Sequence, residues 1–186
     1  IRNFLIFEKI TVVQSLGYNL WKGNHPIAKE NSIVEGVETV DENIKKQMDA
    51  IKIDQYYRIN WDRLFLDLAI KNIKEDPKGH LIFYFKKAIS YIFINFSSHD
   101  PRYWNPFHFI PLLLFGMTSL IGIILSDKKS HQLNYLILLF FVNVGIFSAF
   151  SIMPRYKLVI LPLQIIFTNV LIKRIKEKFF NLRKNN

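Results

Sequence analysis

The stretch of sequence that decides the fold runs from Leu133 to Met153 and reads LNYLILLFFVNVGIFSAFSIM. It lies within a run of 25 residues, Ser130 to Pro154, that contains no Asp, Glu, Lys or Arg. A helix of about 20 apolar residues crosses the hydrocarbon core of a bilayer, so this run is long enough to span a membrane. Two other charge-free runs have the same character, the 24 residues of 103–126 and the 15 residues of 158–172. The predicted transmembrane helices cover about 104–126, 133–153 and 156–172.

The charges are distributed unevenly around these helices. The 186 residues carry a net charge of +10, of which +2 falls on residues 1–106 and +8 on residues 107–186. With three spans, the connection 127–132 and the tail 173–186 share one face, which holds eight Lys and Arg residues against five on the opposite face. Positive charge near span ends favours the cytoplasmic side, so the basic tail is predicted to be cytoplasmic and residues 1–102 extracytoplasmic. Since this orientation explains the charge, nucleic-acid binding is not predicted.

Residues 81–96 form an amphipathic pattern, LIFYFKKAISYIFINF. On a helical wheel the apolar residues share one side, whereas Lys86 and Lys87 lie on the other. Two lysines are costly at the centre of a bilayer. We therefore predict that 81–102 forms a helix lying in the membrane interface and a following turn, with Lys86 and Lys87 in contact with lipid. If the segment spanned the membrane instead, residues 1–80 would be cytoplasmic, and their charge does not decide between the two topologies.

Residues 1–80 are predicted to form a loop region outside the membrane, mixed in structure but mainly helical. The apolar residues of 1–13 suit short strands or a chain that emerges from an earlier span. Glycines and a proline indicate a loop over 17–26. Apolar residues recur at helical spacing over 55–76, and Pro77 is predicted to end that helix. The predicted fold class is thus an α-helical integral membrane protein with an interfacial helix.

Four short motifs follow one another along the chain. They are Arg2-Asn3, the segment GYNLWKGNHP at 17–26, the segment from Ala69 through Pro77 to Lys86, and Arg155-Tyr156-Lys157-Leu158 with Pro162. In this order they resemble the C-terminal part of the membrane glycosyltransferases of the GT-C fold, in the group that includes the dolichyl-phosphate-mannose protein mannosyltransferases and the aminoarabinose transferases. Val159 departs from the pattern, because a proline is common there.

This resemblance implies an activity. Enzymes of the group transfer a sugar from a polyprenyl-phosphate donor on the extracytoplasmic side, and their catalytic carboxylate lies in the N-terminal half. The chain starts at Ile1 without a targeting segment, so we expect it to be the C-terminal part of a larger enzyme and inactive alone. The implied location is the bacterial inner membrane. The implied partners are the sugar donor, membrane lipids and the missing N-terminal half.

The resemblance also indicates where the donor binds. Arg155 and Tyr156 would begin the third span at the outer interface, where a guanidinium and a phenol can hold phosphate oxygens, with Lys157 as a third partner. Arg and Tyr at a helix end are also common interface anchors. Asn24 and His25 would lie in a substrate-facing loop, or would simply form a tight turn.

Other chemistry has weaker signals. The chain has no cysteine, which excludes disulfides and thiolate metal sites, and its five histidines lack the spacing of metal ligands. No metal site is predicted, and no cofactor is identified. The acidic residues Glu38, Asp41 and Glu42 are typical of a solvated loop. Two alternative functions remain, a non-catalytic membrane protein whose outer domain binds a partner or lipid, and a polysaccharide polymerase or flippase that handles carrier lipids.

Overall fold

The structure is a computed structural model that describes residues 15–96, 98, 101–126, 130–152 and 154–184. These residues form α-helices and short 3-10 helices, and no strand occurs among them. The strands suggested for 1–13 lie outside the described residues. The chain divides into two compact units, which we call the first unit (residues 1–85 and 149–151) and the second unit (residues 86–148 and 152–186).

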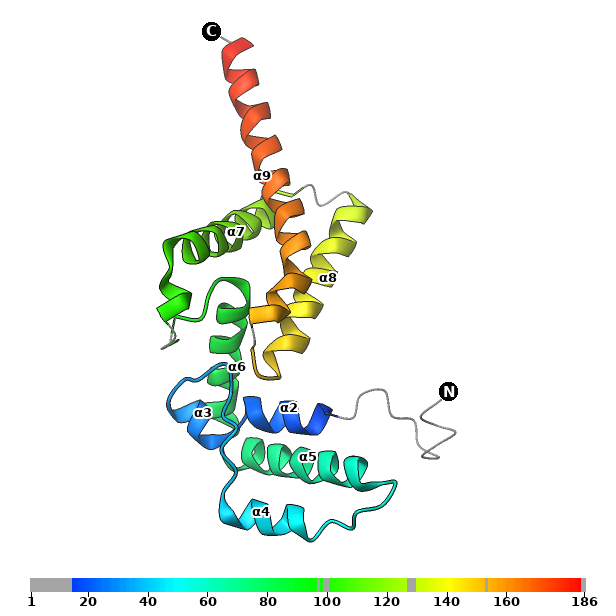
Figure 1. Ribbon diagram of the computed structural model, residues 1–186. Coiled ribbons are helices and arrows are strands. Elements are labelled where there is room, and N and C mark those ends of the chain that lie inside the picture. Colours follow the sequence, from blue (N-terminus) through cyan, green and yellow to red (C-terminus); the bar gives the residue numbers. More distant parts are fainter. Residues whose placement is uncertain (1–14, 97, 99–100, 127–129, 153, 185–186) are drawn as a thin grey trace. The chain divides into compact units, whose positions relative to one another are not determined.

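Among its described residues, the first unit contains four complete helices and the start of α6 (Pro77–Ile92), in chain order (Figure 1). The four complete helices are α2 (Leu16–Gly23), α3 (Pro26–Glu30), α4 (Glu42–Asp49) and α5 (Tyr57–Glu75). The helix predicted over 55–76 is confirmed as α5, which ends just before Pro77. The predicted loop over 17–26 is wrong, because α2 and α3 occupy almost all of it.

The core of the first unit is aromatic. Trp21 of α2 and Phe65 of α5 are both buried, and their ring centroids lie 4.8 Å apart. Ile44 of α4 closes the cluster from a third helix. Helices α2 and α5 approach closely because position 17 is a glycine: a Cβ there would lie 2.0 Å from the main-chain oxygen of Asp62.

The residues after α8 return to the first unit. The Nδ2 group of Asn24 donates to the main-chain oxygen of Ala149 at 2.8 Å, and also to that of Leu20 at 2.8 Å. A Cβ at Gly23 would lie 2.3 Å from the main-chain nitrogen of Ser151. A residue without a side chain is therefore needed where this segment crosses α2.

Helix α6 (Pro77–Ile92) begins at the proline that ends α5. An Asp76 carboxylate oxygen accepts the Gly79 N–H at 2.9 Å and satisfies an amide of the first turn. A row of apolar side chains is exposed along one side of α6, whereas polar side chains of the opposite side are buried. The exposed row consists of Leu81, Ile82, Phe85 and Ile89, and the buried set includes His80, Lys87 and Ser90.

Within the described ranges, three helices are long and apolar enough to cross a membrane, and all three lie in the second unit. They are α7 (Pro106–Ile124), α8 (His131–Ser148) and α9 (Lys157–Lys184), and two 3-10 turns precede α7 and α9, η1 (Pro101–Trp104) and η2 (Pro154–Tyr156). The structure thus has the three long apolar helices that the sequence predicts. The third is longer than predicted, since the apolar part of α9 extends over Lys157–Lys178.

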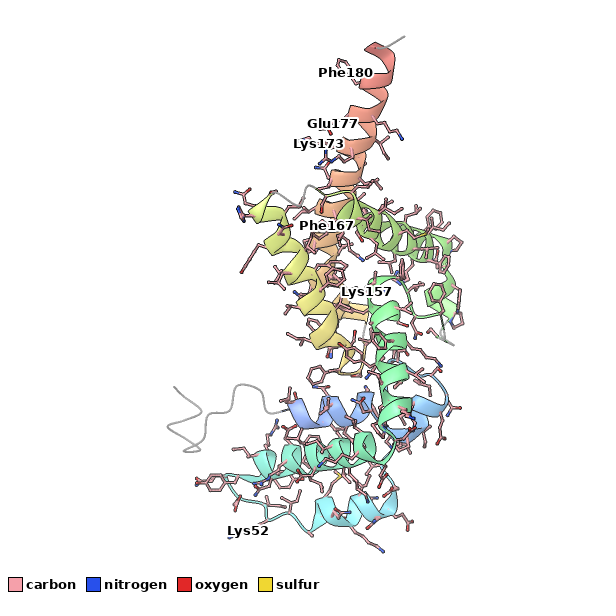
Figure 2. All side chains as sticks on the ribbon, turned by 180° about the vertical axis from the view of Figure 1, so that it is seen from behind. Lys52, Lys157, Phe167, Lys173, Glu177 and Phe180 are labelled. Atoms are coloured by element: carbon pink, nitrogen blue, oxygen red, sulfur yellow. The ribbon has the colours of Figure 1, made fainter. Side chains whose placement is uncertain are left out.

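Helix α9 is the packing centre of the second unit. Helix α7 crosses it and α8 runs beside it (Figure 1). Phe167 of α9 meets Phe140 of α8 edge to face, with ring centroids 5.8 Å apart. On the α7 side, the hydroxyls of Thr118 and Thr168 lie 2.8 Å apart. Figure 2 shows Phe167 among the packed helices, whereas Lys173, Glu177 and Phe180 lie on the part of α9 that extends beyond them.

Small residues make the contact between α7 and α9 possible. Gly116, Ser119 and Gly122 are buried along one face of α7. A Cβ at Gly122 would lie 1.9 Å from the main-chain oxygen of Phe167. Close backbone approach at small residues is the usual way in which helices associate within a bilayer, where burial of apolar surface gives little advantage.

Candidate functional site

The predicted donor site begins at η2, just before the first turn of α9. Arg155 is exposed, and its Cζ atom lies 5.6 Å from the centroid of the Tyr156 ring. The ring of Tyr156 in turn packs on Phe147, with centroids 5.3 Å apart. The guanidinium therefore rests over an aromatic face that α8 supports, which restricts its position while its N–H groups remain open to a ligand.

Tyr91 fixes the backbone at this point. Its hydroxyl donates to the main-chain oxygen of Tyr156 at 3.2 Å, and its ring stacks on Phe147 at 5.4 Å. Burial raises the pKa of Tyr91 to about 12. The phenol thus stays protonated and acts as a donor under physiological conditions.

Lys157 does not join Arg155 as predicted. Lys157 lies among the packed helices (Figure 2). Only 9% of its surface is exposed, and its ammonium donates to the main-chain oxygen of Phe93. Gln164 acts in the same way one to two turns further along α9, since its Nε2 group donates to the main-chain oxygen of Ile92 at 2.8 Å. Carbonyls at a helix end have no partner within the helix. Lys157 and Gln164 therefore cap the C-terminal end of α6, and this leaves Arg155 as the exposed cation of the motif.

Tyr91 and Gln164 were not among the predicted site residues. Gln164 has a clear signal in the sequence, because it is a hydrogen-bonding amide within the charge-free run 158–172. Polar side chains within a membrane span usually face a protein partner. Tyr91 carries no comparable signal, since aromatic residues are frequent throughout 81–96.

Asn24 and His25 belong to the first unit and serve its local structure. Only 5% of Asn24 is exposed, and its side chain ties residue 149 to α2 as described above. The Nδ1 atom of His25 accepts the N–H of Ile27 at 3.2 Å and so caps α3. Burial lowers the pKa of His25, which favours the neutral ring that this hydrogen bond requires.

Lys86 and Lys87 are in different surroundings although they are neighbours in the sequence. Lys86 is exposed, whereas Lys87 is 0% exposed. Burial lowers the pKa of Lys87 to about 7. The lipid contact predicted for Lys87 disagrees with this position, because its ammonium is not at the surface. For Lys86 the contact stays a prediction.

Three acidic residues of the first unit also have structural partners. Glu38 pairs with the ammonium of Lys22, which lowers the pKa of the carboxyl. Asp41 accepts the N–H of Ile44 at 2.7 Å and caps α4. Asp76 pairs with Lys29 at 2.5 Å. Among the described residues, no three His, Asp or Glu side chains are grouped so that they could hold a metal ion.

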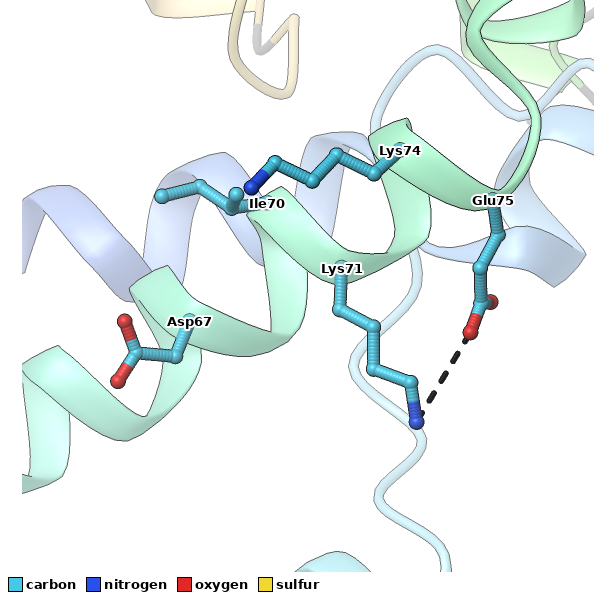
Figure 3. A pocket seen from close by; sticks show the side chains of 5 residues that line it. All are labelled: Asp67, Ile70, Lys71, Lys74 and Glu75. Atoms are coloured by element: carbon cyan, nitrogen blue, oxygen red, sulfur yellow. Dashed lines mark ion pairs between the residues drawn. The ribbon is translucent and has the colours of Figure 1, made fainter.

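A shallow pocket on α5 is a helix surface and not a binding site (Figure 3). All of its lining residues come from α5 itself, and they are Asp67, Ile70, Lys71, Lys74 and Glu75. Its ion pair, Lys71 with Glu75 at 3.8 Å, joins two exposed side chains one turn apart. Such pairs stabilise a helix by about 0.3–0.5 kcal/mol and carry no chemistry.

Comparison with known proteins adds no relative. No protein-family model matches the chain, no curated protein matches it, and no solved structure matches it. The exposed Arg155, directly before a helix long and apolar enough to cross a membrane, is thus the feature on which a functional hypothesis can be built.

Proposed function

We propose that the chain is part of a membrane glycosyltransferase that takes a sugar from a polyprenyl-phosphate-linked donor, and that Arg155 contacts the donor's phosphate. The observation that carries this proposal is the guanidinium of Arg155, exposed over the Tyr156 ring at the start of α9. A lipid-linked phosphate lies at the headgroup level of a bilayer, where the ends of spanning helices also lie.

The chemistry of arginine suits this role. A guanidinium binds two phosphate oxygens at once through its planar set of N–H groups. Its neighbouring lysine, Lys157, is occupied by the Phe93 carbonyl, so the contact depends on Arg155. The four motifs that resemble the GT-C glycosyltransferases support the same function, because one of them contains Arg155 and Tyr156.

The proposal divides the reaction between two parts of an enzyme. The resemblance assigns the catalytic carboxylate to an N-terminal half that precedes the motifs of this chain. The described acidic residues Glu38, Asp41 and Asp76 have structural partners in this chain. We therefore expect donor binding from this chain, and sugar transfer only when the other half is present.

A binding experiment tests the contact directly. The chain is placed in lipid nanodiscs and titrated with a polyprenyl phosphate. We expect Arg155→Ala to weaken binding about tenfold or more, as the loss of a charge-assisted hydrogen bond predicts. Arg155→Lys should be intermediate, since it keeps the charge but loses the planar group.

Arg174→Ala is the matched control. Arg174 is an exposed arginine of α9, but it lies beside Glu177 at 3.4 Å and more than four turns from the start of that helix. The Arg174→Ala variant should bind the polyprenyl phosphate with the same affinity as the unaltered chain. Equal affinity in Arg155→Ala and in the unaltered chain, with equal membrane insertion, would reduce Arg155 to an interface anchor.

A further inference from the structure

A second cavity lies in the first unit, beside the first turns of α2 and α5. It has a volume of about 380 Å³ and is lined by Ser15, Tyr18, Tyr57, Arg58 and Trp61. Sites for small molecules have volumes of about 300–1,000 Å³ and are lined by aromatic side chains with a few polar groups. None of the lining residues takes part in the contact proposed for Arg155.

The aromatic wall of this cavity is held in place from behind. The rings of Tyr18 and Trp61 lie 5.0 Å apart, and both contact the fully buried ring of Phe65, at 5.2 and 4.6 Å. The main-chain N–H of Tyr18 also donates to the Asp62 carboxylate at 3.1 Å. A wall that is ordered before binding loses little conformational entropy when a ligand arrives.

The polar groups of the cavity are available to a ligand. Arg58 is exposed, and within the part of the chain that the structure describes it makes no hydrogen bond or ion pair. The Ser15 hydroxyl accepts the Asn19 Nδ2 group at 3.3 Å and can still donate to a ligand, and the Tyr57 side chain adds a second hydroxyl. The lining thus combines apolar ring faces, two hydroxyls and one cation.

The spacing of the rings limits what can bind. A flat ring held between two aromatic faces needs about 7 Å between them, twice a normal carbon contact distance. The 5.0 Å between Tyr18 and Trp61 excludes this arrangement, so a ligand ring packs on one face of the wall. A sugar ring suits such a wall, because it has a C–H face for the aromatic surface and hydroxyls at its edge.

We propose that this cavity binds the ring of a saccharide that carries an anionic group. The C–H face of the sugar packs on the aromatic wall, its hydroxyls meet Ser15 and Tyr57, and Arg58 pairs with its carboxylate or phosphate. The preference for a saccharide over another ring compound rests on the function proposed above.

The test compares two water-soluble sugars that differ in one group. The full chain in nanodiscs is titrated with methyl glucuronide and with methyl glucoside, and binding is followed by tryptophan fluorescence and by saturation-transfer NMR. We expect the glucuronide to bind about tenfold more tightly than the glucoside, as a charge-assisted contact predicts. Arg58→Gln should remove this preference, and Tyr57→Ala should weaken the binding of both sugars severalfold.

Arg63→Gln is the control, because Arg63 is exposed on the same helix but does not line the cavity. It should keep the preference for the glucuronide. Equal loss in Arg58→Gln and Arg63→Gln, no preference in the unaltered chain, or tighter binding of benzoate, an anionic ring compound that is not a saccharide, than of the glucuronide would each overturn the proposal. Arg155→Ala should bind the glucuronide normally, so failure of this proposal is distinguishable from failure of the lipid-phosphate contact.

Discussion

Replacing Gly122 by alanine should force α7 and α9 apart and destabilise the second unit. The added Cβ would lie 1.9 Å from the main-chain oxygen of Phe167 and 2.7 Å from its carbonyl carbon. Close carbon–oxygen contacts between helices are normally about 3.3 Å or longer, so the helices must separate by about 1.4 Å at this point. Main-chain atoms of a helix cannot rotate out of the way as a side chain can.

The energetic cost follows from this geometry. Overpacking of a well-packed contact costs about 1–3 kcal/mol. The same separation would break the hydrogen bond between Thr118 and Thr168, now 2.8 Å long. Hydrogen bonds between membrane helices contribute about 0.6 kcal/mol on average. We therefore expect Gly122→Ala to lower the free energy of unfolding by about 2–3 kcal/mol.

Reversible unfolding in mixed micelles, with increasing SDS, measures this change. Gly116→Ala is the matched comparison on the same face of α7. There the nearest atom to the added Cβ is a ring carbon of Phe93 at 2.6 Å, which can turn aside, and the nearest main-chain atom, the oxygen of Ile92, is 3.0 Å away and needs to move by only a few tenths of an ångström. Gly116→Ala should cost less than half as much. The reasoning fails if the free energy of unfolding of Gly122→Ala lies within about 0.5 kcal/mol of that of the unaltered chain. An ordinary surface substitution changes this free energy by no more than that.

Two further predictions concern charge and topology. Burial lowers the pKa of Lys87 to about 7 from an ordinary value of 10.5. Between these two pH values the unfolded chain therefore binds more protons than the folded chain. The free energy of unfolding should rise as the pH is raised from 7 to 10.5. Thermal unfolding at pH 7 and pH 10 checks this, and Lys87→Met should reduce the dependence of stability on pH. An unchanged pH dependence in that variant would show that other groups cause it. For topology, we expect a cysteine at the exposed position Lys52 to react with an impermeant thiol reagent from outside the cell, and one at Glu177 only after the membrane is opened (Figure 2). Labelling of position 52 only in opened membranes would mean that α6 spans the bilayer.

The three long apolar helices could be predicted from the sequence because each coincides with a long gap between charges. That signal is local and needs no knowledge of neighbours. The error over 17–26 has a different origin. Glycines at 17 and 23 suggest a turn, but both lie within α2. Because they lack a side chain, the main chain of Asp62 can approach Gly17 and that of Ser151 can approach Gly23. The partners that make these glycines necessary lie 45 and 128 positions along the chain, beyond the reach of a local pattern.

The same limit applies to the candidate site. A lysine at the start of an apolar run predicts an anchor at the membrane surface, and Lys157 fits that pattern. Its actual partner, the Phe93 carbonyl, is 64 residues away. The predicted place of Arg155 in the chain depends only on where the third apolar helix begins, and Arg155 lies in η2, directly before α9. Roles that depend on long-range contacts, such as those of Lys157 and Gln164, required the structure.

The central position of α9 has a consequence for how the protein is made. Helices α7 and α8 leave the ribosome before α9, yet both pack on it. The carbonyls of Ile92 and Phe93 likewise accept hydrogen bonds from side chains of α9. During synthesis these surfaces therefore contact lipid or the insertion machinery until α9 has been made. A premature stop before residue 157 would therefore leave two inserted helices without their shared partner, and such a product should be a ready substrate for membrane proteases.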